Sequence, residues 1–172
     1  MTGPGEEAAL QDRFSPEGSC FGCGPKNDKG LRIKSFVEKR PTEGGGEETV
    51  VIARFSPEPH HVAFPGMLNG GIIGALLDCH SNWCAAHHLM ERSGASAPPC
   101  TVTADFHVAL KRPTPLAEVL LEARVVDSKD DRATIEATLR AVGPTGELGK
   151  VCATCRGTFV AVKEGHPAFH RW

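Results

Sequence analysis

The sequence predicts an α+β fold, in which an antiparallel sheet of about six strands wraps around one long central helix. Between Glu58 and Glu91 the single formally charged side chain is Asp78, which lies in a long apolar segment, 70–86, of helical character. Two strand-like segments precede this segment and four follow it. A helix without charged residues on its outer face is enclosed on most sides, so we expect the sheet to curl over it.

The strand-like segments are rich in β-branched and apolar residues and are separated by turn-forming residues. A Gly-rich turn separates the first two, and short turns containing Pro, Gly or Asp separate the last four. Polar residues alternate along the later segments, so each strand has one polar face, and the short turns predict an antiparallel meander. The expected strands are 31–38, 47–55, 101–110, 118–127, 132–142 and 148–162.

One domain accounts for most of the chain, because 172 residues fit a single hydrophobic core. We expect a flexible N-terminal arm over residues 1–19, where Gly, Pro and Glu are frequent. The folded domain is expected over residues 20–162, and a C-terminal tail over residues 163–172.

Charge and hydropathy argue against two classes of partner. The formal net charge of -2 gives no general attraction to nucleic acid or to anionic membranes. No charged start followed by an apolar run marks a secretory signal, and polar residues interrupt the long apolar segment. We therefore expect a soluble, cytoplasmic protein that binds neither nucleic acid nor a membrane.

The seven cysteines include two C-x-x-C pairs, Cys20 with Cys23 and Cys152 with Cys155. Together the two pairs would make a four-thiolate zinc site. Residues three apart on a strand point to opposite faces, however, so the sulfurs of the second pair are expected to diverge.

The first pair lies in a turn with the Gly and Pro residues of a metal-binding loop, for which His60 and His61 are candidate further ligands. The sequence leaves open whether Cys20 and Cys23 bind zinc or pack as reduced thiols. No cofactor is expected, and no metal is assigned to the reactive site.

Asp78 is the first candidate for chemistry. A buried carboxylate is costly unless it is paired, and such groups concentrate at reactive sites. A helix start presents unpaired N–H groups and a partial positive charge, which suit an oxygen that gains negative charge during acyl transfer. Gly70, at the start of the expected helix, lets the backbone come close to such an oxygen.

Gly70 and Asp78 cannot act together within one chain. Eight residues of helix span about 12 Å, so both groups cannot contact one carbon atom. Two subunits with antiparallel helices would bring Gly70 of one beside Asp78 of the other. We therefore predict a homodimer with two equivalent sites, and a tetramer built as a dimer of dimers stays open.

Small and polar side chains share the Asp78 side of the expected helix. Asn82, one turn after Asp78, is a candidate to hold the attacking water or to orient the carboxylate. The small residues there either leave room for a ligand or permit close packing of two helices, and both readings can hold at once. These residues are Gly71, Gly74, Ala75, Ser81, Asn82 and Ala85.

These motifs resemble the hotdog-fold thioesterase superfamily, in its phenylacetate-type (PaaI-like) branch. The similarity covers roughly residues 20–162 and implies the hotdog fold. In related enzymes the helix begins with His-Gly-Gly, whereas here the His position holds Asn69. The matching segments are 20–25 with 30–31, 64–66, 69–71, 75–78 and 111–115.

The resemblance implies an acyl-CoA thioesterase that acts on a small aromatic or medium-chain acyl group. Asp78 would be the general base or the nucleophile, and the Gly70 amide would polarise the carbonyl across the dimer interface. Asn69 is expected to cap the helix and is a candidate to orient the substrate, with Gly71 beside it as a substrate-binding residue.

Lys111 and Arg112, at a strand end, are candidate contacts for the phosphates of coenzyme A, and the alternative is a solvated surface pair. A second function stays open: a non-hydrolytic, regulatory acyl-CoA-binding module in which Asn69 in place of His has accompanied loss of turnover. Hydration of an enoyl thioester is less favoured, because the Asp–His motif typical of that chemistry is not found.

Overall fold

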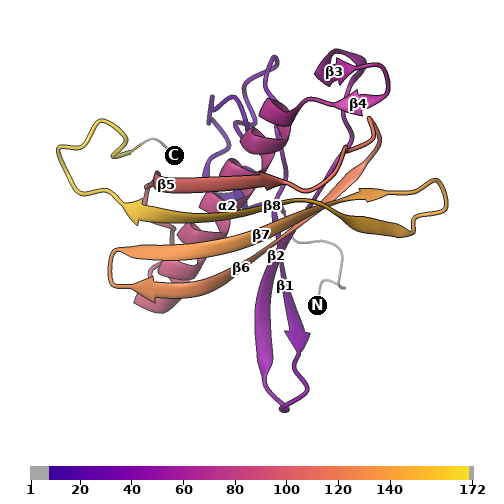
Figure 1. The fold of residues 1–172 in the computed structure, drawn as a ribbon. Helices are drawn as coiled ribbons and strands as arrows, with labels where there is room; N and C mark the ends of the chain where they lie inside the picture. The colour runs from indigo at the N-terminus through magenta and orange to yellow at the C-terminus, as the bar shows by residue number, and fades with distance from the viewer. Residues whose placement is uncertain (1–7, 171–172) are drawn as a thin grey trace.

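The computed structural model describes residues 8–170, in which six strands form one antiparallel sheet around a long helix (Figure 1). The strand order is β1-β2-β6-β7-β8-β5, so β1 and β5 are the edge strands. The α+β class and the hotdog arrangement predicted from the sequence are confirmed. The sheet contains β1 (Phe36–Pro41), β2 (Glu47–Phe55), β5 (Thr101–Leu110), β6 (Val119–Lys129), β7 (Arg132–Val142) and β8 (Leu148–Ala161). The other elements are α1 (Leu10–Phe14), the 3-10 turn η1 (Pro59–His61), β3 (Val62–Phe64), β4 (Met67–Leu68) and α2 (Gly70–Ser93).

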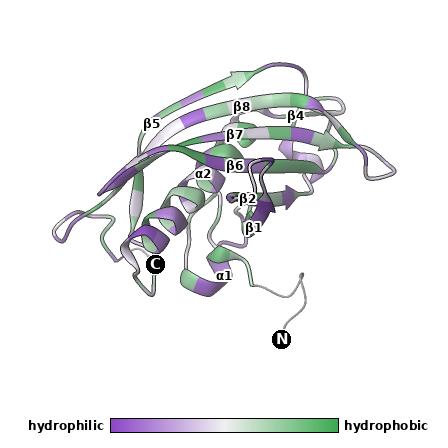
Figure 2. Ribbon diagram, turned by 90° about the horizontal axis from the view of Figure 1, so that it is seen from below, coloured by the Kyte–Doolittle hydropathy of each residue, from purple (hydrophilic) through white to green (hydrophobic). Residues whose placement is uncertain are grey.

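The central helix, α2, lies on the concave side of the sheet, which curves over it (Figure 2). Leu76 and Leu77 are fully buried against the strands, as the near-absence of charged residues between Glu58 and Glu91 predicts. The helix continues beyond the predicted end at residue 86 and stops at Gly94, whose φ of 66° is the left-handed conformation that ends many helices. None of the helices within residues 8–170 has the length and apolar character that crossing a membrane requires.

The first strand begins later than predicted, at Phe36 rather than at Leu31. Leu31 and Ile33 are buried in the core, but their N–H groups donate to carbonyls of the loop 20–24 at 2.7 and 3.0 Å. Arg32 between them has a φ of 50°, which interrupts an extended strand. The alternation of apolar residues in this segment correctly predicts which side chains are buried. It does not predict that the backbone pairs with the loop 20–24 instead of with a strand.

The predicted flexible arm contains a packed segment. α1 lies within it, and Leu10 and Gln11 are buried. This part of the arm is therefore packed against the domain, because Leu10 joins the hydrophobic core. Residues 1–7 of the predicted arm and residues 171–172 of the predicted tail lie outside the described residues, and residues 164–170 form turns.

A buried chain of hydrogen bonds joins α1 to α2 and the sheet. Gln11 Nε2 donates to Ser35 Oγ at 3.0 Å, and Ser35 N donates to Gln11 Oε1 at 2.8 Å. Ser35 Oγ lies 2.9 Å from His80 Nδ1, and His80 Nε2 lies 3.0 Å from the Val51 carbonyl oxygen. A carbonyl only accepts, so Nε2 carries a proton, and in the neutral ring that complete burial favours, Nδ1 accepts from the Ser35 hydroxyl. Burial lowers the pKa of His80 to about 4.

His80 is predicted to make the stability of the fold depend on pH. Its folded-state pKa lies below the unfolded value of about 6.5, so the unfolded chain binds the extra proton as the pH falls from 6.5 to 4. The free energy of unfolding should fall by roughly 3 kcal/mol over this window from this residue. Chemical denaturation of wild type and of His80→Gln at a series of pH values measures how much His80 contributes to the pH dependence of the free energy of unfolding. Equal slopes for the two proteins would contradict a neutral, buried His80.

Candidate functional site

Asp78 lies on the part of α2 that faces the edge strand β5. Its side chain is partly buried, and the Thr103 hydroxyl of β5 donates a hydrogen bond of 2.7 Å to its Oδ1. This bond orients the Asp78 carboxylate toward β5. Sequence reasoning did not single out Thr103.

A β-bulge explains how β5 presents Thr103 to the helix. The register of the β5–β8 pairing shifts between Thr103 and Asp105, which makes Ala104 an extra residue in β5. Before the bulge Thr103 faces α2, whereas after it Phe106 and Val108 pack against the core. Asp105 is exposed as a result. The bulge thus places a hydroxyl, rather than a second carboxylate, beside Asp78.

Asn82 holds the same strand one helical turn further along. It is 7% exposed, its Nδ2 donates to the Thr101 carbonyl at 3.4 Å, and the Thr101 hydroxyl donates to its Oδ1. Both ends of the Asn82 amide therefore fasten α2 to β5, two residues before Thr103. The predicted role of Asn82 in holding a water molecule stays a prediction.

The start of α2 is capped by Asn69. Its Oδ1 accepts hydrogen bonds from the N–H groups of Gly71 at 2.8 Å and Ile72 at 3.3 Å, and its carbonyl accepts from Ile73. The expected capping role of Asn69 is confirmed. These bonds use three of the four N–H groups of the first turn. The fourth, that of Gly70, can donate to a ligand.

Two glycines at this start have different surroundings. A Cβ on Gly70 would lie 3.0 Å from Cδ1 of Leu110, at the end of β5. A Cβ on Gly71 would lie 3.0 Å from the Asn69 Oδ1, so the absence of a side chain there makes room for the cap. Gly71 is exposed, and its predicted substrate contact stays a prediction.

Lys111 and Arg112 lie at the same end of the molecule as Gly70. Their N–H groups both donate to the Cys152 carbonyl, at 2.8 and 3.2 Å, and their side chains are exposed. They directly follow Leu110, which contacts Gly70. The predicted basic pair and the predicted amide donor are therefore neighbours, whereas Asp78 is two turns of helix away.

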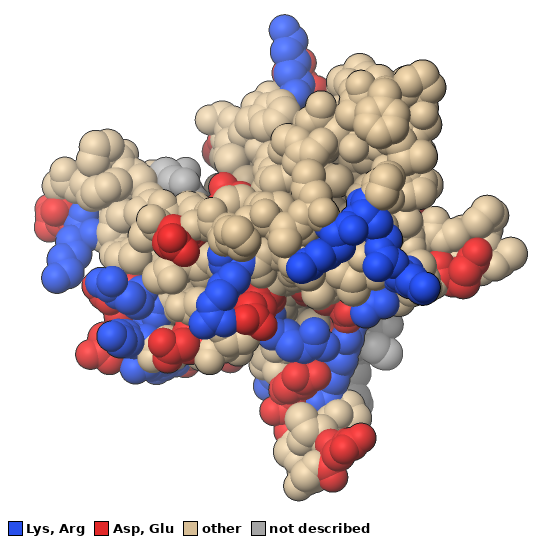
Figure 3. All heavy atoms as spheres, viewed as in Figure 1, with Lys and Arg blue, Asp and Glu red and all other residues tan. Residues whose placement is uncertain are grey.

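The surface around the start of α2 is poor in charge. In Figure 3 the Lys, Arg, Asp and Glu side chains gather over the lower strands, while the surface over β3 and β4 is mostly uncharged. Val62 is 39% exposed, Phe64 60% and Leu110 57%. Apolar side chains exposed in this way are typical of a surface that contacts another chain or an apolar ligand.

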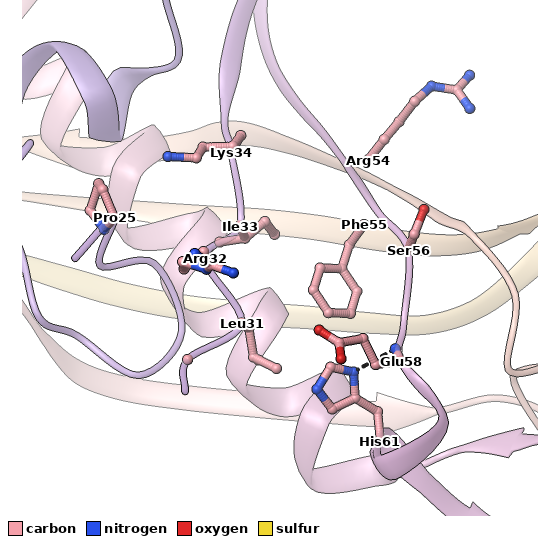
Figure 4. Close-up of a pocket in the computed structure, with 11 residues that line it drawn as sticks. Pro25, Leu31, Arg32, Ile33, Lys34, Arg54, Phe55, Ser56, Glu58 and His61 are labelled. Carbon is pink, nitrogen blue, oxygen red and sulfur yellow. Dashed lines mark hydrogen bonds between the residues drawn. The ribbon is translucent and has the colours of Figure 1, made fainter. Parts of the chain in front are cut away.

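A separate hollow of about 380 Å³ lies between the segment 30–34 and the end of β2 (Figure 4). Its wall includes His61, whose Nδ1 accepts from the Glu58 N–H at 3.0 Å and whose pKa is lowered by burial. In Figure 4 Arg54 points away from His61. None of the residues predicted for the acyl-transfer site lines this hollow, so it is distinct from the Asp78 region.

Three cysteines form the group of possible metal ligands within residues 8–170. The predicted pair Cys20 and Cys23 lies beside Cys79 of α2, and the candidate ligands His60 and His61 are not part of the group. Hydrogen bonds from the Cys23 and Cys79 side chains lower the pKa of Cys20. Cys79 could not be predicted as a member of this group, because the contact joins segments far apart in the chain.

The fold is similar to solved structures of thioesterase superfamily proteins. One from Shewanella loihica PV-4 is 26% identical, with a TM-score of 0.55 over 76% of this chain and 91% of that chain. A Bacillus halodurans protein, whose structure contains CoA, is 19% identical, with a TM-score of 0.53 and 74% of each chain covered. A phenylacetic acid degradation-related protein from Ralstonia eutropha JMP134 is 16% identical, with a TM-score of 0.52 over 73% of this chain and 84% of that chain.

No protein-family model and no curated protein sequence matches the chain. The similarity thus lies in the three-dimensional structure: the chain has the hotdog fold of thioesterase superfamily structures.

Proposed function

We propose that the chain is an acyl-CoA thioesterase that acts on a small aromatic or medium-chain acyl group. The observation that carries this proposal is the Asp78 carboxylate, held by the Thr103 hydroxyl beside the edge of the sheet, on a helix whose first turn leaves the Gly70 amide for a ligand. The similarity to thioesterase superfamily structures, and to a Bacillus halodurans protein whose structure contains CoA, supports the same chemistry. The free thiols of the seven cysteines suit a reducing, cytoplasmic location.

Asp78 acts on water in the simplest route. It takes a proton from a water molecule as the water oxygen attacks the thioester carbonyl carbon, and the partner's Gly70 amide donates to the carbonyl oxygen as that oxygen gains negative charge. The C–S bond then breaks, and the thiol leaves with the proton that Asp78 accepted. In the other route Asp78 attacks the carbon, the C–S bond breaks and releases the thiolate, and water hydrolyses the resulting mixed anhydride to the free acid and the Asp78 carboxylate, with the proton released on hydrolysis passing to the thiolate. Both routes require the carboxylate that Thr103 orients.

A second copy of the chain completes this site. β5 is an edge strand, and Thr103, Ala104 and Asp105 are exposed on it. The unpaired backbone groups of an edge strand are a template for pairing with another chain. Two β5 strands paired about a two-fold axis would bring the two α2 helices together in antiparallel orientation, with each Gly70 near the partner's Asp78. A homodimer is therefore part of the proposal, and the dimer of dimers stays open.

The carrier portion of the substrate would lie at the Gly70 end. Lys111 and Arg112 are exposed there and have the charge that suits the phosphates of coenzyme A. The uncharged surface over β3 and β4 lies beside them and suits the less polar part of the substrate. The proposal therefore assigns the carrier and the acyl group to the two sides of the Gly70 amide.

An acyl-CoA-binding module without turnover is the second candidate. It is favoured by Asn69, which stands where related enzymes have His and whose Oδ1 is occupied by the Gly71 and Ile72 amides. Such a protein would bind acyl-CoA at the same surface and release no thiol.

Asp78→Asn is predicted to lower kcat at least about 100-fold, because an amide cannot accept the proton of the attacking water. Thr103→Val, which keeps the shape but removes the hydrogen bond, should lower kcat about tenfold. The matched control is Asp127→Asn, an exposed carboxylate of β6 away from the proposed pairing edge, which should stay within about twofold of wild type. Free-thiol release from a panel of acyl-CoAs measures all four proteins. Equal, slow release by wild type and Asp78→Asn, with acyl-CoA binding intact, would favour the binding module.

Replacing Lys111 and Arg112 by Ala should raise the KM for acyl-CoA about tenfold, because charge-assisted contacts to phosphate are lost. The same variant should hydrolyse an N-acetylcysteamine thioester, which has no phosphate groups, as wild type does. Steady-state kinetics with the two substrates of one acyl group separates these effects. An equal rise in KM for both substrates would remove the phosphate role.

A further inference from the structure

The cysteine cluster stands apart from the proposed hydrolytic chemistry. Cys20 and Cys23 come from the loop between α1 and β1, and Cys79 comes from α2. Their three Sγ atoms all lie within 4.8 Å of one another, and the Cys20 and Cys79 sulfurs are 3.7 Å apart. Cys79 faces the loop, whereas its neighbour Asp78 faces β5.

The spacing of the sulfurs suits a tetrahedral metal ion. Zinc–sulfur bonds of about 2.3 Å in a tetrahedron separate two sulfurs by about 3.8 Å, close to the distance between Cys20 and Cys79. A disulfide would use two sulfurs at about 2 Å and leave the third unexplained. One metal ion bound by all three sulfurs therefore explains the cluster better than a disulfide does.

The loop is built around these sulfurs. A Cβ on Gly22 would lie 2.3 Å from the Cys79 Sγ, so only glycine lets the loop approach α2 this closely. A Cβ on Gly24 would lie 2.4 Å from the Cys20 backbone nitrogen, which makes the turn after Cys23 equally tight. Gly24 N donates to the Cys20 carbonyl at 2.8 Å and closes the turn.

We propose that Cys20, Cys23 and Cys79 form a three-thiolate Zn²⁺ site, whose fourth position is taken by water or another ligand from solvent. Binding forms three Zn–S bonds, and the three thiol protons pass to solvent. Cys20 is exposed, and a hollow of about 330 Å³ bordered by Cys20, Cys23 and Trp83 gives access to the ion. The ion ties the loop to α2 one residue after Asp78 and thereby fixes the helix that carries the proposed base.

The test uses the full chain purified under reducing conditions without chelator. About one zinc ion per chain is expected by mass spectrometry of the metal, and removal of the ion by a chelator should lower the thermal midpoint. Replacement by Co²⁺ should give the sulfur-to-metal charge-transfer band and the intense visible bands of a tetrahedral thiolate site. Cys20→Ser and Cys79→Ser should each lose at least about 90% of the bound zinc. Cys100→Ser, a partly exposed cysteine outside the cluster, is the matched control and should bind zinc as wild type does.

Wild-type protein that contains little zinc and gives no thiolate–Co²⁺ spectrum would overturn the proposal. Zinc content unchanged in Cys20→Ser would overturn it as well, as would a disulfide between two of the three residues in protein purified under reducing conditions. If Cys79→Ser does not fold, Cys20→Ser decides the test alone, because its exposed side chain contributes little to packing. Thiol release from acyl-CoA by wild type is measured in parallel, so loss of the zinc proposal and loss of the thioesterase proposal are separate results.

Discussion

The rigidity of α2 is the constraint on which the proposed chemistry depends. Gly70 and Asp78 belong to one continuous helix, and eight residues of α-helix set them about 12 Å apart whatever the rest of the chain does. Side-chain motion cannot remove that separation, since one partner is a backbone amide. The amide and the carboxylate can meet on one carbonyl carbon only if each comes from a different helix. The exposed edge strand β5, beside Asp78, is the place where a second copy can supply that helix.

Three local structural features of the single chain position the groups of the proposed site. The Asn69 cap occupies the Gly71 and Ile72 amides and so singles out the Gly70 amide. The bulge at Ala104 presents the Thr103 hydroxyl to Asp78. The cysteine cluster, if it holds zinc, braces the helix from its other side. Each feature acts on the position or orientation of a group rather than on the group's own chemistry, as preorganised sites require.

Periodicity made most of the fold predictable. The strands at 47–55, 101–110 and 132–142 have the predicted bounds, because their alternating residues face either the helix or solvent. α2 starts where expected, because Asn69 and the glycines after it are typical of a helix start. The segment 31–35 misled the strand prediction, since it alternates like a strand but pairs with a loop.

The site was only partly predictable for a related reason. Asp78 and Asn69 stand out in the sequence by charge and by capping preference. Thr103 does not, because the one-residue bulge that turns it toward Asp78 leaves no pattern in the sequence. Cys79 likewise reads as one more small apolar residue of the helix until the loop carrying Cys20 and Cys23 is folded onto it. Contacts between distant segments decided both cases.

Complementation between two inactive variants tests the shared site most directly. Gly70→Pro removes the amide N–H at a helix position where proline is favoured, and Asn69 before it already has the extended ψ of 133° that proline requires. Gly70→Ala keeps the N–H and serves as its control. Gly70→Pro and Asp78→Asn, each inactive alone, should regain about one quarter of wild-type activity per chain when unfolded and refolded as an equal mixture, because half of the dimers are mixed and each has one intact site. A mixture as inactive as its two components would contradict a site shared between two chains.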